Sequence, residues 1–237
     1  MKRVFLVLAV LFALAPVAVH ADTPLRTVVY RYSMDARGFF GAPGIQGGMV
    51  TENGGSGTTG GTGTVRVDVV KATPDDGLLV DVTQNIDREL HPLQTLRCAI
   101  YGRTEDVVCD QNIGATSTET VLLTYFGRYF YEPSRVDSSG RWHTSPVIHD
   151  KGVQIDNDFT VTKKDGDLLT MHIDRIEKGG GYVATTQGSL VYDTAYEVPD
   201  YIKVAASTQR SGEQGDMNVE LKLLSDSMAP RSGQSSH

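Results

Sequence analysis

Two histidines and an aspartate occur within RWHTSPVIHDKG, residues 141–152, and side chains of these types bind metal ions. Zinc sites usually contain a closely spaced pair of ligands, and the separation of His143 from His149 and Asp150 fits no such pattern. Loop histidines without a close partner are usually solvated. We therefore predict no metal and no cofactor, and the roles of His143 and His149 stay open.

A second candidate for chemistry is GSGTTG, residues 55–60, which has the G-x-G-x-x-G spacing of a dinucleotide-binding turn. That turn requires a strand before it and a helix after it, so that helical N–H groups face the pyrophosphate. Here TENG precedes the glycines, and the valines of TVRVDVV alternate with other residues after them, which is typical of a strand. A P-loop is also excluded, because no lysine follows the glycines until Lys71. The segment predicts a loop that enters a strand.

Catalytic patterns are weak elsewhere in the chain. Ser189 lies in TQGSLVY and lacks the G-x-S-x-G setting of a serine hydrolase nucleophile. Carboxylates brought together by folding could form a glycosidase-like pair, which a sequence alone does not exclude. The acids occur mainly in turns, such as Asp75 and Asp165, and indicate a solubilising surface. We predict no catalytic residues and favour a non-enzymatic role, with an enzyme as the third alternative.

The two cysteines occur in LRCAIYGRTEDVVCD, where two strand-like segments flank a polar turn. If Cys98 lies opposite Cys109, then Ile100 faces Val107 and Tyr101 faces Asp106, so the register of a hairpin is consistent. The sequence lacks C-x-x-C, and no histidine occurs in the hairpin. In an oxidising compartment this pair predicts a structural disulfide.

The first residues predict export. Lys2 and Arg3 precede an apolar run from Val4 to Ala15, and small residues precede a cleavage point near Ala21–Asp22. We expect residues 1–21 to be a signal peptide and the mature protein to be secreted or periplasmic, without a transmembrane anchor. Removal of residues 1–21 leaves 20 basic and 29 acidic residues, a formal net charge of −9. Clustered basic residues are absent, so nucleic acid is not an expected partner.

The glycine-rich stretch 38–63 predicts a flexible loop. Phe39 and Phe40 are apolar residues among these glycines. They could form a mobile lid or a contact patch for a ligand, although packing against the edge of the core is the more ordinary role.

The rest of the chain reads as about ten strands in a mostly sequential meander, with turn signals such as TPDDG and KKDGD. Most strands are apolar on one face only, which is typical of an antiparallel sheet. We predict one β-rich domain over residues 22–226, with a disordered tail at 227–237. The oligomeric state stays undetermined.

One amphipathic helix is expected near residues 117–131, with Thr116 and Glu119 as a capping box and Pro133 as its end. Its apolar stripe is expected mainly to pack on the sheet, and secondarily to form part of a ligand wall. With Phe39 and Phe40, the residues of the stripe proposed to line a ligand are Leu122, Tyr125, Phe126, Tyr129 and Phe130.

A comparison of sizes predicts the architecture. About ten strands at ~4.8 Å spacing form a sheet roughly 45 Å wide, whereas one helix is ~10 Å across. The remaining apolar face must be covered by the sheet curling into a half-barrel or barrel, or by folding into two layers; we predict the curled sheet. This plan of export signal, strand meander and aromatic helix resembles half-barrel envelope carriers of lipids and lipoproteins, as a fold-level analogy. We expect binding of an apolar molecule or apolar protein segment; the alternative is an envelope interaction or structural module without a ligand.

Overall fold

The computed structural model describes residues 23–38, 57–73, 77–87, 95–102, 106–110, 117–128, 130–145, 147–148, 152–179, 181–210 and 213–229. Several predictions lie outside these ranges: the signal peptide, residues 39–56 of the glycine-rich stretch with Phe39 and Phe40, Tyr129, His149, and residues 230–237 of the tail. They stay predictions.

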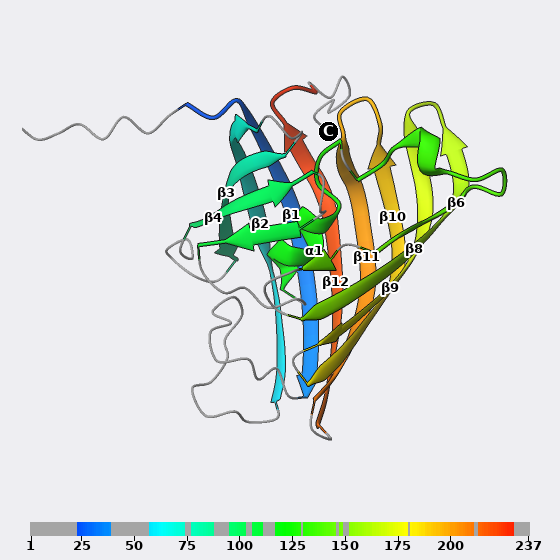
Figure 1. Ribbon diagram of the computed structural model, residues 1–237. Helices are drawn as coiled ribbons and strands as arrows, with labels where there is room; N and C mark the ends of the chain where they lie inside the picture. Colours follow the sequence, from blue (N-terminus) through cyan, green and yellow to red (C-terminus); the bar gives the residue numbers. More distant parts are fainter. Residues whose placement is uncertain are drawn as a thin grey trace, which may run out of the picture.

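The described chain is mostly one antiparallel sheet (Figure 1). Eleven strands follow one another in the order β5-β4-β3-β2-β1-β12-β11-β10-β9-β8-β6, and β7 pairs with β8. The strands are β1 (Arg26–Gly38), β2 (Gly57–Ala72), β3 (Leu78–Ile86), β4 (Leu96–Tyr101), β5 (Asp106–Cys109), β6 (Arg141–Thr144), β7 (Val147–Ile148), β8 (Val153–Asp165), β9 (Leu168–Gly179), β10 (Tyr182–Asp193), β11 (Val198–Arg210) and β12 (Glu213–Asp226).

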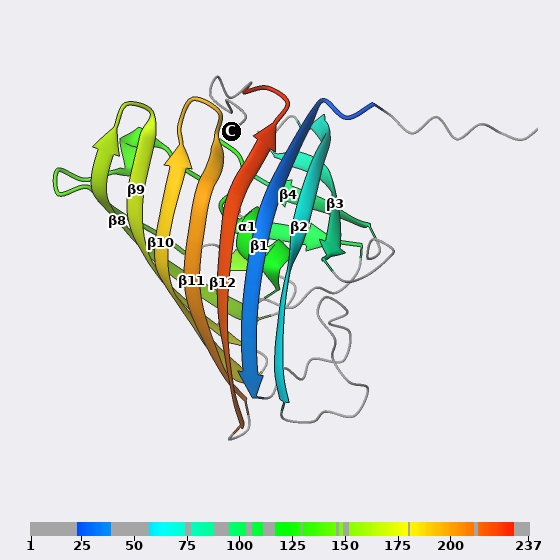
Figure 2. The same ribbon diagram turned by 180° about the vertical axis from the view of Figure 1, so that it is seen from behind.

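The first and last long strands lie side by side, as Figure 2 shows for the blue β1 and the red β12. This pairing joins the meander β2 to β5 to the meander β8 to β12, so the sheet is continuous. Arg26 Nε donates a hydrogen bond to Asp226 Oδ1 over 3.0 Å across this junction. The sheet curls but ends at two separate edges, β5 and β6. The predicted curled antiparallel meander with one helix is confirmed, in its open half-barrel form.

Glycines and bulges produce the curl, because they let a strand bend where a side chain would be crowded. A Cβ placed on Gly188 would lie 2.1 Å from the backbone oxygen of Lys203. A Cβ on Gly63 would lie 1.9 Å from the oxygen of Asn85 and 2.7 Å from the ring of Tyr32, the residue opposite Gly63 on β1. Register shifts interrupt four strand pairs, at Val29/Tyr30, Val69/Lys71, Val161/Lys163 and Val191/Tyr192.

The strand that follows the glycine-rich stretch begins earlier than expected. β2 starts at Gly57 and not after residue 63, so the loop prediction is wrong for residues 57–63. The physical reason is the length of β1, whose residues 32–38 pair with residues 57–63 of β2. A long neighbouring strand supplies backbone hydrogen bonds that override the low strand propensity of glycine.

The two faces of the sheet differ sharply in polarity. Inward residues of the central strands are buried and mainly apolar, as with Tyr30, Leu190 and Leu221, which are fully buried. Outward residues such as Arg31, Lys203 and Glu220 are exposed. The inward face is concave and carries the helix α1 (Thr118–Thr124), which both views place on one side of the sheet.

Helix α1 is shorter than predicted and ends seven residues before position 131. Ser117 is its N-cap in place of the predicted Thr116, because Ser117 Oγ accepts a 3.0 Å hydrogen bond from the Thr120 N–H. The N–H groups of Tyr125 and Phe126 bond to Leu122 and Leu123, and Gly127 takes a φ of +109°, so the chain leaves the helix. Pro133 begins a short 3₁₀ helix, η1 (Pro133–Arg135). Within the described part of the chain, no helix has the length and apolar character to cross a membrane.

The predicted cysteine hairpin is confirmed. Cys98 and Cys109 form a disulfide between β4 and β5, with Cα atoms 3.9 Å apart. Ile100 lies opposite Val107 and Tyr101 opposite Asp106. The disulfide holds an edge strand of only four residues to its neighbour.

Candidate functional site

An aromatic cluster fills the concave face beside α1. Phe130 lies at its centre, with ring centroids 5.3 Å from Tyr125 and 5.1 Å from Tyr192. Trp142, from edge strand β6, stacks on Phe159 at 4.7 Å. The Tyr192 hydroxyl donates a 2.7 Å hydrogen bond to the Gly127 carbonyl and so ties β10 to the segment after α1.

Four of the predicted ligand-lining residues belong to this region. They are at most 7% exposed and form part of the hydrophobic core: Leu122, Tyr125, Phe126 and Phe130. The structure therefore brings them together with the sheet, as packing predicts. Their contact with a ligand stays a prediction.

Further along the strands, most inward side chains on β1, β12, β11 and β10 are small. We name six of them, from two adjacent rows of opposing residues, the small-residue band: Ala36, Ala184, Thr186, Ala206, Thr208 and Gly215. The larger Met217 of β12 lies between Ala36 and Ala206 in the first of these rows and is 3% exposed. The three alanines are 4–5% exposed. One row nearer the helix, the positions on the same four strands hold Met34, Val219, Val204 and Gly188, so three of these four side chains are larger than alanine.

The same two rows carry polar residues on β9, β8 and β6, apart from Ile155 on β8, and Tyr182 of β10 lies one row further along. We name five residues the polar belt: Thr144, Asn157, Arg175, Glu177 and Tyr182. Thr144, Asn157 and Arg175 lie opposite one another on β6, β8 and β9. Asn157 Nδ2 donates to Thr144 Oγ1 over 3.0 Å, and the Arg175 guanidinium donates to Asn157 Oδ1 over 3.3 Å and to Glu177 Oε2 over 3.1 Å. The Tyr182 hydroxyl donates to Glu177 Oε1.

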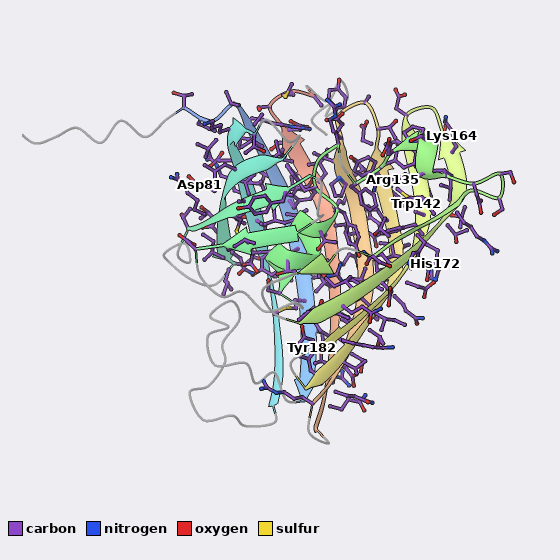
Figure 3. All side chains as sticks on the ribbon, viewed as in Figure 1. Asp81, Arg135, Trp142, Lys164, His172 and Tyr182 are labelled. Carbon is purple, nitrogen blue, oxygen red and sulfur yellow. A yellow bond between two sulfur atoms is a disulfide. The ribbon has the colours of Figure 1, made fainter. Side chains whose placement is uncertain are left out.

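Thr144, Asn157 and Glu177 of this belt are buried, and Arg175 and Tyr182 are partly buried, although two of the five side chains are charged. The side chains of Arg175 and Glu177 are 14% and 8% exposed, and Asn157 is 2% exposed. Burial raises the pKa of Tyr125 to about 12, and the nearby Arg175 charge opposes that rise. Burial and the hydrogen bond to Glu177 raise the pKa of Tyr182. Figure 3 labels Tyr182 near the lower end of the sheet, so the belt runs from that end toward edge strand β6.

The polar belt offers hydrogen-bonding groups in a fixed arrangement. Its groups are hydrogen-bond donors and acceptors that are already paired, and paired charges in an apolar wall favour one ligand orientation over others. Together, the small-residue band and the polar belt form a mainly apolar surface with a few fixed polar groups. We take these two sets as the candidate site.

The alternation of residues along β8 and β9 already indicates the polar belt, although we did not predict it from the sequence. Met171, Ile173, Arg175 and Glu177 have the same parity on β9, so the alternation that places the first two inward also places the charges inward. Asn157 shares the parity of Ile155 and Phe159 on β8.

A second surface feature lies on the outer face. A groove with a volume of ≈ 470 Å³ crosses five strands, from β1 to β9. Its outward side chains are polar or small: Ser33, Asp35, His172, Gln187, Ser189, Lys203, Ala205, Asn218 and Glu220. His172 stands on this outer side of β9 and is half exposed (Figure 3).

His143 occupies a hydrogen-bond network on the surface. Its Nδ1 lies 3.0 Å from Asp158 Oδ1, and its Nε2 lies 2.7 Å from Ser145 Oγ. This order matches a Ser-His-Asp triad, but Ser145 Oγ also donates to Asp156 over 2.9 Å, so a second carboxylate competes with His143 for the hydroxyl proton. Asp158 is 70% exposed, and the triad requires a buried partner for histidine. Among the described residues, no group of three potential ligands could hold a metal ion.

The similarity of this chain to known proteins is limited to weak structural similarity. No protein-family model and no curated protein matches the sequence. One solved structure, described as lipid-protein interactions in lipovitellin, aligns with 91% of this chain at 9% identity and a TM-score of 0.45. This chain covers 27% of that chain, and at this TM-score the similarity supports no conclusion about function.

Proposed function

We propose that the mature protein binds an apolar molecule, of the lipid type, on the concave face of its sheet after export from the cytoplasm. The observation that carries this proposal is the group of small inward side chains around Met217, next to a mostly buried, paired set of polar groups. An acyl chain needs the space that leucine-sized side chains would fill, and the belt supplies the few polar contacts that orient such a ligand.

A pair of adjacent residues provides a matched test. Ala206 faces the concave side in the small-residue band, and Ala205 faces the outer groove. Ala206→Phe should remove a retained lipid, while Ala205→Phe should leave it bound, because only the first change fills the proposed site. The measurement is native mass spectrometry of residues 22–237 purified from an exporting host, followed by organic extraction.

Thermal unfolding separates the proposal from its main rival. If Ala206→Phe loses the lipid with only a small change in Tm, the space belongs to a ligand. If it strongly lowers Tm and the wild-type protein retains and binds no lipid, the interior is a packed core, since overpacking a filled core typically costs about 1–3 kcal/mol.

The alternative function is an envelope interaction module without a small ligand. The groove on the outer face is the observation that favours it, because this feature lies on the opposite side from the apolar core. Under this alternative, Ala205→Phe would weaken partner capture and Ala206→Phe would not.

Export is tested separately. We expect the secreted or periplasmic fraction of an exporting host to contain a chain that begins at Asp22, because the small residues before it suit signal peptidase. Intact mass measures this directly. A chain that retains residues 1–21 in the soluble cytoplasmic fraction would contradict it.

A further inference from the structure

We infer that the ligand of the concave site carries an uncharged polar head, as a monoacylglycerol does, and is not a fatty-acid anion. This inference rests on the proposed function, because it names the ligand class of that site. The observation behind it is the charge of the polar belt.

The belt is electrically neutral and internally paired. Arg175 contributes one positive charge and Glu177 one negative charge, and the two side chains are in contact at 3.1 Å. Both carboxylate oxygens of Glu177 already accept a hydrogen bond, one from Arg175 and one from the Tyr182 hydroxyl. The positive charge at the site is therefore already balanced before a ligand binds.

Arg210 lies opposite Tyr182 on β11, and Glu213 lies opposite Arg210 on β12, so the row of Tyr182 contains two further charged residues of opposite sign. Three other rows of inward residues contain Met34, Ala36 and Gly215 and run across the described strands from β2 to β6. Apart from Arg175 and Glu177, their side chains are apolar or neutral. Among the described residues of these rows, each positive residue has a negative residue beside it, so an incoming carboxylate would have to compete with Glu177 or Glu213 for a cation.

An anion would also have to lie near Glu177. Two carboxylates in a buried site repel each other, and an ionised group removed from water without a partner carries a large desolvation cost. A hydroxyl or ester head avoids both effects and needs only hydrogen bonds. Thr186 is the cross-strand neighbour of Arg175, and its own hydroxyl group is a hydrogen-bond partner for such a head group beside the belt.

Three ligands with the same acyl chain test the inference: monoolein, methyl oleate and oleate, each titrated into the delipidated full mature chain at pH 8. We expect the two neutral lipids to bind at least tenfold more tightly than oleate. Oleate binding as tight as the neutral lipids would overturn the inference while leaving the proposed function intact. Binding of none of the three, with no lipid retained on purification, would instead reject the proposed function and this inference with it.

A charge variant makes the test specific to the belt. Glu177→Gln leaves Arg175 uncompensated, so oleate binding should gain at least tenfold relative to monoolein. Glu220→Gln, which makes the same charge change on the outer face, should leave the ratio unchanged. If both variants shift the ratio equally, net charge and not the belt sets the preference, and the inference fails. Should Glu177→Gln not fold, the three-ligand series on the wild-type protein still decides.

Discussion

At the residue scale, Glu119 is where burial and charge conflict most clearly. It lies in the first turn of α1, is 4% exposed, and its Oε2 atom is buried without a hydrogen-bond partner. Burial raises the pKa of the Glu119 carboxyl above its usual range. The folded state therefore prefers the protonated form, and this contribution to stability is present below the pKa of unfolded Glu and lost as pH rises through the folded pKa.

Replacing Glu119 with Gln should remove this loss of folding stability at higher pH. We expect the Tm of Glu119→Gln to exceed the wild-type Tm at pH 7.5, by about 2–4 °C for each kcal/mol recovered, and the two values to converge near pH 4. Thermal unfolding followed by circular dichroism over this pH range measures the difference. A difference that does not change with pH would show that another group controls it.

Glu132 provides a control of opposite sign. Hydrogen bonding from the Ser134 hydroxyl, together with the Arg135 charge, lowers the pKa of this exposed carboxyl. Its contribution is present above the unfolded pKa and lost as pH falls through the folded pKa. Glu132→Gln should therefore not raise Tm at pH 7.5, and any small decrease should vanish at low pH.

At the element scale, the cysteine hairpin is a structural brace distant in the sheet order from the polar belt. The disulfide closes a loop with a sequence separation of 11, for which chain entropy gives at most about 3 kcal/mol. Reduction should lower the free energy of unfolding without releasing a bound lipid, as denaturant titration and native mass spectrometry would show. Lipid release from a reduced but folded protein would place the hairpin in the site.

The curl of the sheet depends on particular glycines. Gly188→Ala should lower stability by about 1–3 kcal/mol, because its Cβ would collide with the backbone of β11, which a side-chain rotation cannot relieve. Gly61 lies in the row that also contains Met34 and Gly188, and a Cβ there meets nothing within 4 Å. Gly61→Ala should thus be neutral or slightly stabilising. Equal losses of Tm in the two variants would contradict this account of the curl.

Local patterns account for what could be predicted of these elements. Alternating residues and turn signals were sufficient for the pairing of β2 with β3 and of β8 with β9, because each pair is joined by a short turn. The pairing of β1 with β12 joins segments about 200 residues apart, and no local pattern encodes it. The helix was predicted to be too long because aromatic residues at helical spacing can also pack into the core from outside a helix, as Phe130 does. The belt was readable from strand parity, but its hydrogen bonds depend on the register between three strands.

At the scale of the whole molecule, the open sheet has two edges of different strength. Edge strand β5 is held by a disulfide, whereas β6 is held by four residues of backbone pairing and by the burial of Trp142. A ligand can reach a buried concave face only if part of the wall opens, and openings of low free energy occur where few contacts must break. The β6 edge is therefore the expected entry route.

Hydrogen exchange followed by mass spectrometry tests this route. Amides of residues 141–144 should exchange faster than those of the central strands β1 and β12, and bound monoolein should slow exchange in β6 because it closes the open state. The crosslinked strands β4 and β5 serve as the internal control and should show little change on binding. If β6 exchanges only with global unfolding, or if monoolein protects β5 and not β6, entry occurs elsewhere. Since Thr144 of β6 bonds to Asn157 of the polar belt, opening this edge would also expose the belt to the incoming head group.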